Sequence, residues 1–126
     1  MATSLNNLAE LYREQGKYQD AAPLYKRALA INEKALGPDQ PGVAIDLNNL
    51  ASLYFAQGKY GEAEPLYQRA LAIVEKSLGP VHPYVSICLE NYAALLKRMG
   101  REAEAAPLEA RAQTIRAKQA RDNPNK

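Results

Sequence analysis

The chain has 126 residues, of which 47% are hydrophobic and 24% charged, and its net charge is +2. This length suits one domain with one core, and the near balance of charge gives no reason to expect nucleic acid or an anionic membrane as partner. No apolar run approaches the roughly 20 residues of a membrane span. The single cysteine excludes an intrachain disulfide and fits a reducing compartment, so we expect a cytoplasmic protein.

The sequence repeats itself with a period of 42 residues. Residues 5–18 read LNNLAELYREQGKY, and residues 47–60 read LNNLASLYFAQGKY. The same interval continues into a third copy for leucine, alanine, glycine and proline, namely at Leu5, Leu47 and Leu89, Ala9, Ala51 and Ala93, Gly16, Gly58 and Gly100, and Pro23, Pro65 and Pro107. We therefore predict one domain over residues 1–126, with repeats over 1–42, 43–84 and 85–120 and a polar tail over 121–126.

Each repeat predicts two helices. In chain order the expected pairs are 3–15 with 19–36, 43–57 with 61–78, and 84–99 with 103–120. In the second repeat, the first helix carries one apolar stripe at i, i+3, i+4 and i+7, formed by Leu47, Leu50, Ala51 and Tyr54. Two short amphipathic helices cannot bury their stripes alone, whereas stacked pairs share one continuous core. The pattern therefore predicts an all-α solenoid of three stacked helix-turn-helix units.

Glycine and proline mark the expected helix ends. Gly58 stops the first helix of the second repeat, because glycine adopts the left-handed conformation at low cost. Pro65 is tolerated only near the first turn, so the second helix starts at about residue 61 or 62. Gly79 and Pro80 stop that helix, and Pro83 stands where the next one begins.

The spacing resembles that of a known repeat family. The stretch Leu47-x2-Leu50-Ala51-x2-Tyr54, followed by Ala63-x3-Tyr67, is similar to the tetratricopeptide pattern, whose usual length is about 34 residues. The surplus lies in a longer second helix and in the LGPxxP connections at 36–41 and 78–83, which resemble the kinesin-light-chain type. The resemblance implies a right-handed superhelix whose first helices line a concave groove for a protein or peptide partner.

The two ends of the array differ from its middle. Residues 1–4 align with 43–46, so the chain opens at a first helix; this suits a piece of a longer array, while Met1 equally suits a natural start. At the other end, the tyrosines and leucines of the second helix become Glu109 and Gln113. A polar outer face is what a terminal capping helix needs, since nothing stacks on it.

Candidate catalytic or metal-binding residues are few. His82 is the only histidine and lies in a connection, where we expect a solvent-facing residue at a helix entry rather than a metal ligand. Cys88 has no histidine to activate it, and we interpret it as a packed or half-exposed thiol. The glycines are helix stops and form no phosphate-binding loop. We therefore expect no enzyme, no metal site and no cofactor.

The side of the first helix opposite the stripe is the candidate binding face. At about 100° per residue, Asn49 and Ser52 lie opposite the stripe, with Asn48 and Phe55 on one flank, all facing away from the core. The resemblance places this side in the concave groove. The predicted peptide-binding residues are Asn6, Asn7, Glu10 and Arg13 in the first repeat, Asn48, Asn49, Ser52 and Phe55 in the second, and Asn91, Lys97 and Arg98 in the third.

The paired asparagines have two interpretations. A carboxamide offers two donors and one acceptor without charge, so a row of them could hydrogen-bond an extended or short helical peptide. Alternatively, Asn7, Asn49 and Asn91 bond to one another or to nearby backbone and set the angle between repeats. Both interpretations stay open at this point. Lys97 and Arg98 would attract an acidic segment of the peptide.

A second function is an assembly element that stacks or self-associates through its first repeat. The first helix pair has no repeat ahead of it in this sequence. Its apolar residues would then leave surface open to solvent, at Leu5, Leu8, Leu11 and Tyr12. That surface would stack on upstream repeats or on another copy of the chain.

Overall fold

The structure, a computed structural model, describes residues 2–122 and arranges them in six helices, with no strand among these residues. The helices are α1 (Ala2–Glu14), α2 (Tyr18–Leu36), α3 (Pro41–Ala56), α4 (Tyr60–Leu78), α5 (Pro83–Arg98) and α6 (Glu102–Asp122). Their ends lie within two residues of the predicted ones, which confirms the all-α prediction. Of the predicted tail, Arg121 and Asp122 continue α6, and residues 123–126 lie outside the described part.

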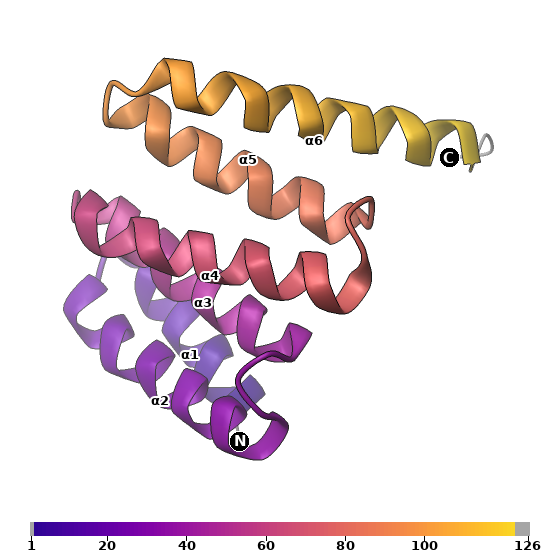
Figure 1. The fold of residues 1–126 in the computed structure, drawn as a ribbon. Coiled ribbons are helices and arrows are strands. Elements are labelled where there is room, and N and C mark those ends of the chain that lie inside the picture. The colour runs from indigo at the N-terminus through magenta and orange to yellow at the C-terminus, as the bar shows by residue number, and fades with distance from the viewer. Residues whose placement is uncertain (1, 123–126) are drawn as a thin grey trace.

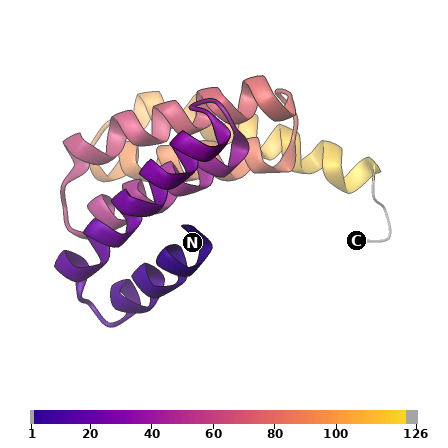
Figure 2. The same cartoon turned by 90° about the horizontal axis from the view of Figure 1, so that it is seen from below.

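The helices form three hairpins, α1 with α2, α3 with α4 and α5 with α6, that stack in chain order (Figure 1). Adjacent hairpins meet through α2 and α3 and through α4 and α5, and α3 also contacts α5. Figure 2 shows the hairpins following an arc that is open on one side, with α1 and α6 at its two ends. No helix of residues 2–122 has both the length and the apolar character to cross a membrane.

The turn inside each hairpin depends on a glycine. Gly58 has a φ of 77°, in the left-handed region that disfavours side chains with a Cβ. The chain reverses there, so the amide of Lys59 donates to the carbonyl of Tyr54 at 2.8 Å and the Gly58 amide donates to that of Phe55 at 3.0 Å. These bonds satisfy carbonyls at the end of α3 and confirm the predicted stop.

The connection between the second and third hairpins begins and ends at the residues that the sequence predicts. Gly79, with a φ of 92°, directly follows α4, and Pro83 occupies the first turn of α5. His82 is exposed and caps α5, because its Nδ1 accepts a hydrogen bond from the amide of Tyr84 at 3.0 Å. The expectation of a solvent-facing residue at a helix entry is confirmed.

One hydrophobic core runs through the second and third hairpins. Its buried members come from α3, α4, α5 and α6, and include Val43, Leu47, Val74, Leu89 and Ile115. Leu50 and Leu53 of α3 extend the packing onto the first hairpin. Stacking therefore buries the apolar stripes that a single hairpin would expose.

Candidate functional site

The first asparagine of each doublet holds neighbouring hairpins together. Asn6 on α1 donates from Nδ2 to Oδ1 of Asp46 on α3 at 2.8 Å. Asn48 on α3 donates from Nδ2 to Sγ of Cys88 on α5 at 3.2 Å, and to the hydroxyl of Tyr84 at 3.3 Å. Asn6 and Asn48 occupy equivalent positions 42 residues apart, and so do Asp46 and Cys88. The same contact therefore forms twice, once between α1 and α3 and once between α3 and α5.

The expectation that Asn48 faces away from the core is wrong. Its side chain is buried between α3 and α5. On an isolated helix its position is a flank, but α5 covers that flank once the hairpins stack. Cys88 is buried too, as the prediction of a packed thiol allowed, and burial raises the pKa of the thiol above its ordinary value. A neutral, enclosed thiol is a poor nucleophile.

The second asparagine of each doublet, and Asn91 at the equivalent position of the third repeat, are in a different situation. Asn7 is exposed, and Asn49 and Asn91 are half-buried. Within residues 2–122, none of these three amides has a hydrogen-bond partner, so the bracing described for the first asparagine does not extend to them. The three lie at equivalent positions on α1, α3 and α5 and share one side of the stack.

Two exposed isoleucines accompany these amides. Ile45 is 43% exposed and Ile87 is 46% exposed, each one helical turn before Asn49 and Asn91 respectively. Residues four apart lie on the same helix face, so the side of α3 and α5 that carries the free amides also carries apolar contact area. The predicted site residues include neither isoleucine, although at about 100° per residue Ile45 lies opposite the apolar stripe with Asn49 and Ser52. The spacing of four was the signal that would have found them.

Ser52 and Phe55 pack within the second hairpin. The hydroxyl groups of Ser52 and Tyr67 lie 3.0 Å apart and share a hydrogen bond. Burial raises the pKa of Tyr67, which keeps this phenol neutral and able to donate or accept. Phe55 is half-buried, and its ring meets Tyr60 edge to face with centroids 5.6 Å apart. Both predicted site residues therefore have structural contacts of their own.

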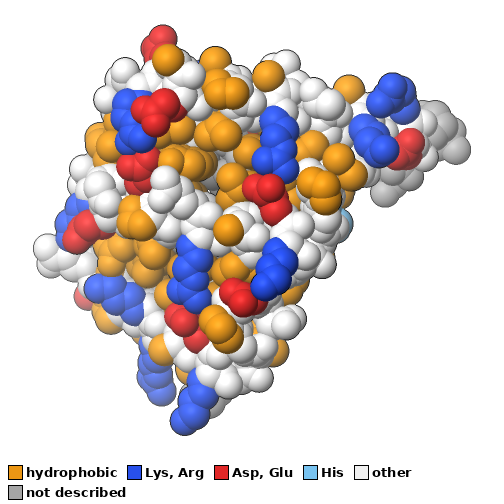
Figure 3. Space-filling model, in the orientation of Figure 1, with side chains coloured by type: hydrophobic (Ala, Val, Ile, Leu, Met, Phe, Trp, Pro, Cys, Tyr) orange, Lys and Arg blue, Asp and Glu red, His pale blue; other side chains and the backbone are white. Residues whose placement is uncertain are grey.

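Of the predicted charged site residues, Glu10, Arg13 and Lys97 form ion pairs, whereas Arg98 does not within residues 2–122. Arg13 lies 3.4 Å from Glu10 on the same helix, and Lys97 Nζ lies 2.6 Å from Glu109 Oε2 on α6. Arg98 is exposed and has no ion pair within residues 2–122. On the face shown in Figure 3, Lys and Arg side chains are interspersed with Asp and Glu, and hydrophobic side chains reach the surface between them. The surface in this view has no large field of one sign.

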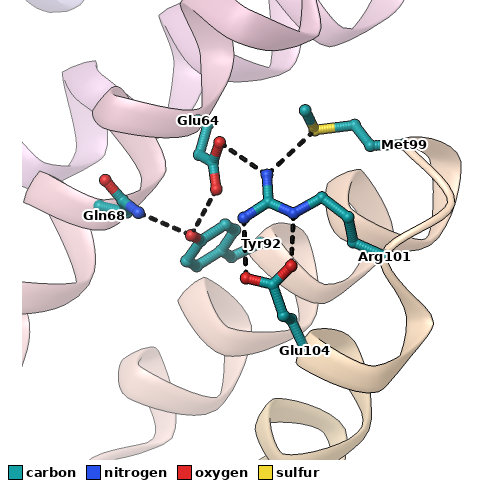
Figure 4. A network of polar contacts seen from close by, with 6 residues as sticks. All are labelled: Glu64, Gln68, Tyr92, Met99, Arg101 and Glu104. Atoms are coloured by element: carbon teal, nitrogen blue, oxygen red, sulfur yellow. Dashed lines mark hydrogen bonds and ion pairs between the residues drawn. The ribbon is translucent and has the colours of Figure 1, made fainter.

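A polar network that sequence analysis missed joins the second and third hairpins (Figure 4). Glu64 on α4 accepts hydrogen bonds from the hydroxyl of Tyr92 at 2.8 Å and from Nη1 of Arg101 at 2.9 Å. Gln68 donates to the same Tyr92 hydroxyl at 2.7 Å, and Arg101 also pairs with Glu104. Hydrogen bonding from Arg101 holds the pKa of Glu64 below its ordinary value.

The described residues offer no metal centre. Among residues 2–122, no three His, Cys, Asp or Glu side chains are grouped so that they could hold a metal ion. The polar clusters instead join helices to one another. Of the predicted site residues within 2–122, Asn7, Asn49, Asn91 and Arg98 have side chains with no hydrogen bond or ion pair, and Ile45 and Ile87 lie exposed on the same side as the amides.

Comparison with known proteins identifies the repeat. The family model of the tetratricopeptide repeat matches residues 1–73 and again residues 45–118. No curated protein matches the chain. Among solved structures, BtubC (BKLC) from P. vanneervenii is 30% identical with a TM-score of 0.86, over 94% of this chain and 47% of that one.

Two further structures are similar. A kinesin-light-chain-like protein of Podosopora anserina with nearly identical TPR-like repeats is 30% identical with a TM-score of 0.85, over 93% of this chain and 56% of that one. The N-terminal domain of stress-induced protein-1 (STI-1) from C. elegans is 15% identical with a TM-score of 0.71, over 90% of this chain and 83% of that one, and shares the fold. The chain thus spans about half the length of the first two relatives.

Proposed function

This chain belongs to the tetratricopeptide repeat family, with repeats of the kinesin-light-chain-like type, and we propose that it binds a peptide segment of a partner protein. The peptide, extended or a short helix, would lie across α1, α3 and α5 on the side that carries Asn7, Asn49 and Asn91. Proteins of this family generally mediate protein–protein interaction; the location of the peptide is the specific part of the proposal.

The observation that carries the proposal is the row of three unpaired amides. Each carboxamide can donate two hydrogen bonds and accept others without adding charge, which suits a peptide backbone of any sequence. Asn49 and Asn91 are half-buried, so a peptide that completes the hydrogen bonds of these amides would stabilise the complex. The first asparagines, Asn6 and Asn48, lack this freedom because they already join hairpins.

Apolar and charged neighbours would supply selectivity. Ile45 and Ile87 offer exposed aliphatic area beside the amides, which favours apolar side chains on the same side of the peptide. Arg98 ends α5 in the third hairpin and has no ion pair within residues 2–122, so an acidic residue near that end of the peptide would be favoured. Lys97 is the weaker choice for this role, because Glu109 already neutralises it.

The test uses Asn49, the middle amide of the row. A peptide selected from a random displayed library against the whole chain serves as the probe. Asn49→Ala should weaken its affinity by about 1–3 kcal/mol if a bond of the peptide backbone is left buried and unpaired. The melting temperature should stay almost unchanged, since alanine is the better helix former. Unchanged affinity of Asn49→Ala for every selected peptide would refute the proposed location.

A second candidate is an assembly element, and the exposure of α1 favours it. Leu8 is 41% exposed and Leu11 is 49% exposed, whereas the equivalent Leu50 and Leu53 of α3 are 4% and 0% exposed. Solvent-facing leucines at positions that stacking buries elsewhere indicate a surface suited to association. Sedimentation over a range of protein concentrations, with Leu11→Ser as the control, tests whether this surface binds another chain.

A further inference from the structure

One side of the first helices stays open even where hairpins stack on both sides of them. α3 packs against α2, α4 and α5, yet Ile45 is 43% exposed and Ala56, at the end of the same helix, is exposed. The exposure of this side is therefore a property of the stack itself and does not depend on what precedes α1. We call it the open face.

Three rows of residues cross the open face from α1 to α5. They are the apolar row of Ile45 and Ile87, the amide row of Asn7, Asn49 and Asn91, and the charged row of Glu14, Ala56 and Arg98. Members of one row are 42 or 84 positions apart, so they occupy equivalent places on successive first helices. On each helix the rows are separated by four and by seven residues, spacings that keep them on one side.

The charged row has opposite charges at its two ends. Glu14 on α1 and Arg98 on α5 are exposed, and within residues 2–122 neither has an ion pair. Ala56 lies between them and is neutral. The other charged residues of α1 and α5 are paired, namely Glu10 with Arg13, Lys97 with Glu109 and Glu90 with Arg116. The open face is thus negative at α1 and positive at α5.

The amide row favours an extended peptide over a helical one. A helix satisfies its own backbone N–H and C=O groups, whereas an extended chain leaves them free for a partner. The amides of Asn7, Asn49 and Asn91 can supply both donors and acceptors to such a chain. Successive side chains of an extended peptide point to opposite sides, so one set would face the apolar row and the other the charged row.

The stacking distance sets the spacing of charges in the peptide. Hydrogen bonds from Asn6 to Asp46 and from Asn48 to Cys88 hold α1 beside α3 and α3 beside α5. Packed helices lie roughly 8–10 Å apart, which places α1 about 16–20 Å from α5. An extended chain rises about 3.3 Å per residue and covers this span in about six residues. Because six is even, residues i and i+6 face the same side.

We propose that the open face binds an extended peptide of mixed charge, with a basic residue against Glu14 and an acidic residue about six positions away against Arg98. Apolar residues at the odd positions between them face Ile45 and Ile87. This inference rests on the first proposed function and names the class of peptide that it takes. The charges decide which end of the peptide lies on α1, since the amides can bond to a backbone running in either direction.

The first test reads the charge pattern from selected peptides. A random displayed library is selected against the whole chain at low ionic strength, where the attraction between exposed charges is least screened. The binders should be enriched in a basic and an acidic residue about six positions apart. A pool without this pair would overturn the inference, and so would a pair about 13 positions apart, the spacing of a helical peptide at about 1.5 Å per residue.

The second test assigns each charge to its residue. One selected peptide is made in three versions that carry Lys and Glu, two Glu, or two Lys at the two charged positions. The native chain should bind the mixed version about 3- to 10-fold more tightly than the others, the effect of exchanging an exposed attraction for a repulsion. Glu14→Arg should instead prefer the version with two Glu, and Arg98→Glu the version with two Lys.

Two controls accompany the affinity measurements. A double variant with Glu62→Arg and Lys76→Glu keeps the net charge and changes two exposed residues of α4, outside the open face. It should prefer the mixed peptide as the native chain does. Asn49→Ala should weaken all three versions to a similar extent, because this amide meets the peptide backbone rather than its charges.

The outcomes distinguish this inference from the function on which it rests. If Asn49→Ala weakens binding while the native chain binds the three versions equally, the charge order is wrong and the proposed location stands. A preference for the mixed version that neither Glu14→Arg nor Arg98→Glu alters would also overturn the inference, because the charges would then meet other residues. If Asn49→Ala leaves the affinity of every peptide unchanged, the proposed location and the inference fail together.

Discussion

Asn48 donates a hydrogen bond to the sulfur of Cys88 across 3.2 Å, and both side chains are buried between α3 and α5. The amide also reaches the Tyr84 hydroxyl, so one side chain bonds to two residues of the next hairpin. The side chain of its neighbour Asn49 makes no hydrogen bond within residues 2–122. Two identical residues, adjacent in sequence, therefore have different surroundings.

We expect Asn48→Ala to lower the free energy of unfolding by about 1–2 kcal/mol, because it removes a buried hydrogen-bonding group and leaves a small void. Asn49→Ala should change it by less than about 0.5 kcal/mol. Thermal denaturation of both variants at one protein concentration makes the comparison. Equal losses from the two substitutions would contradict the division between a bracing and a free asparagine.

Asp46 gives a second prediction about the joint between hairpins. This carboxylate is buried and accepts hydrogen bonds from Asn6 at 2.8 Å and from Asn32 at 2.5 Å. Asn32→Ala should cost about 1.5–3 kcal/mol, the range for a bond to a charged group. Asn6→Ala should cost a similar amount, and the double variant should depart from the sum, because both amides serve one carboxylate. Additive urea midpoints would argue against a shared site.

The Glu64 network predicts a dependence of stability on pH. Bonding from Arg101 lowers the pKa of Glu64 from its ordinary value of 4.5, so the ionised form is favoured in the folded chain. Its contribution is complete above that ordinary value and is lost as the pH falls through the lowered pKa. Glu64→Gln should therefore cost about 1 kcal/mol at pH 7 and flatten the acid limb of the stability curve.

Urea denaturation between pH 7 and pH 3 provides the measurement for Glu64. Glu62→Gln, a change at an exposed position of the same helix, serves as the control and should leave the acid limb as it is. If Glu64→Gln loses stability on acidification as steeply as the native chain does, the network makes no contribution through this carboxylate.

Gly58 and Gly61 allow a comparison of backbone effects alone. A Cβ added at either position meets no other atom within 4 Å, but only Gly58 has a positive φ. Gly58→Ala should destabilise by about 1–2 kcal/mol because of its left-handed backbone. Gly61→Ala, inside α4, should stabilise by about 0.5 kcal/mol. Melting temperatures that move in the same direction would show that the end of α3 does not depend on left-handed glycine.

Helix positions could be predicted from sequence because local signals agree with one another. The 42-residue period, Gly58, Gly79 and Pro83 each mark a boundary without reference to the rest of the molecule. The ion pair between Arg69 Nη2 on α4 and Glu33 Oε2 on α2, 3.3 Å apart, was not predicted, since it depends on how far one hairpin is displaced along the next. Its signal was nonetheless present, because both residues recur 42 positions later as Arg111 and Glu75.

The candidate site was harder to predict than the fold. A helical wheel treats a helix as having one buried side, and this misplaced Asn48, whose flank is covered by the next hairpin. The network of Glu64, Tyr92 and Arg101 was missed for a different reason. None of these three residues recurs with the same type in the other repeats, so no periodic pattern pointed to them.

The stacking order of the hairpins has a consequence for how quickly the chain folds. Helix contacts run chiefly between elements adjacent in the sequence, and alternate helices such as α3 and α5 touch less extensively. A chain whose contacts are mostly local has low contact order, so little loop entropy is lost before contacts form, and such helical proteins fold within microseconds to milliseconds. Refolding should then begin in any adjacent pair of hairpins and spread outward, with the joint at Asn48 and Cys88 as a candidate nucleus.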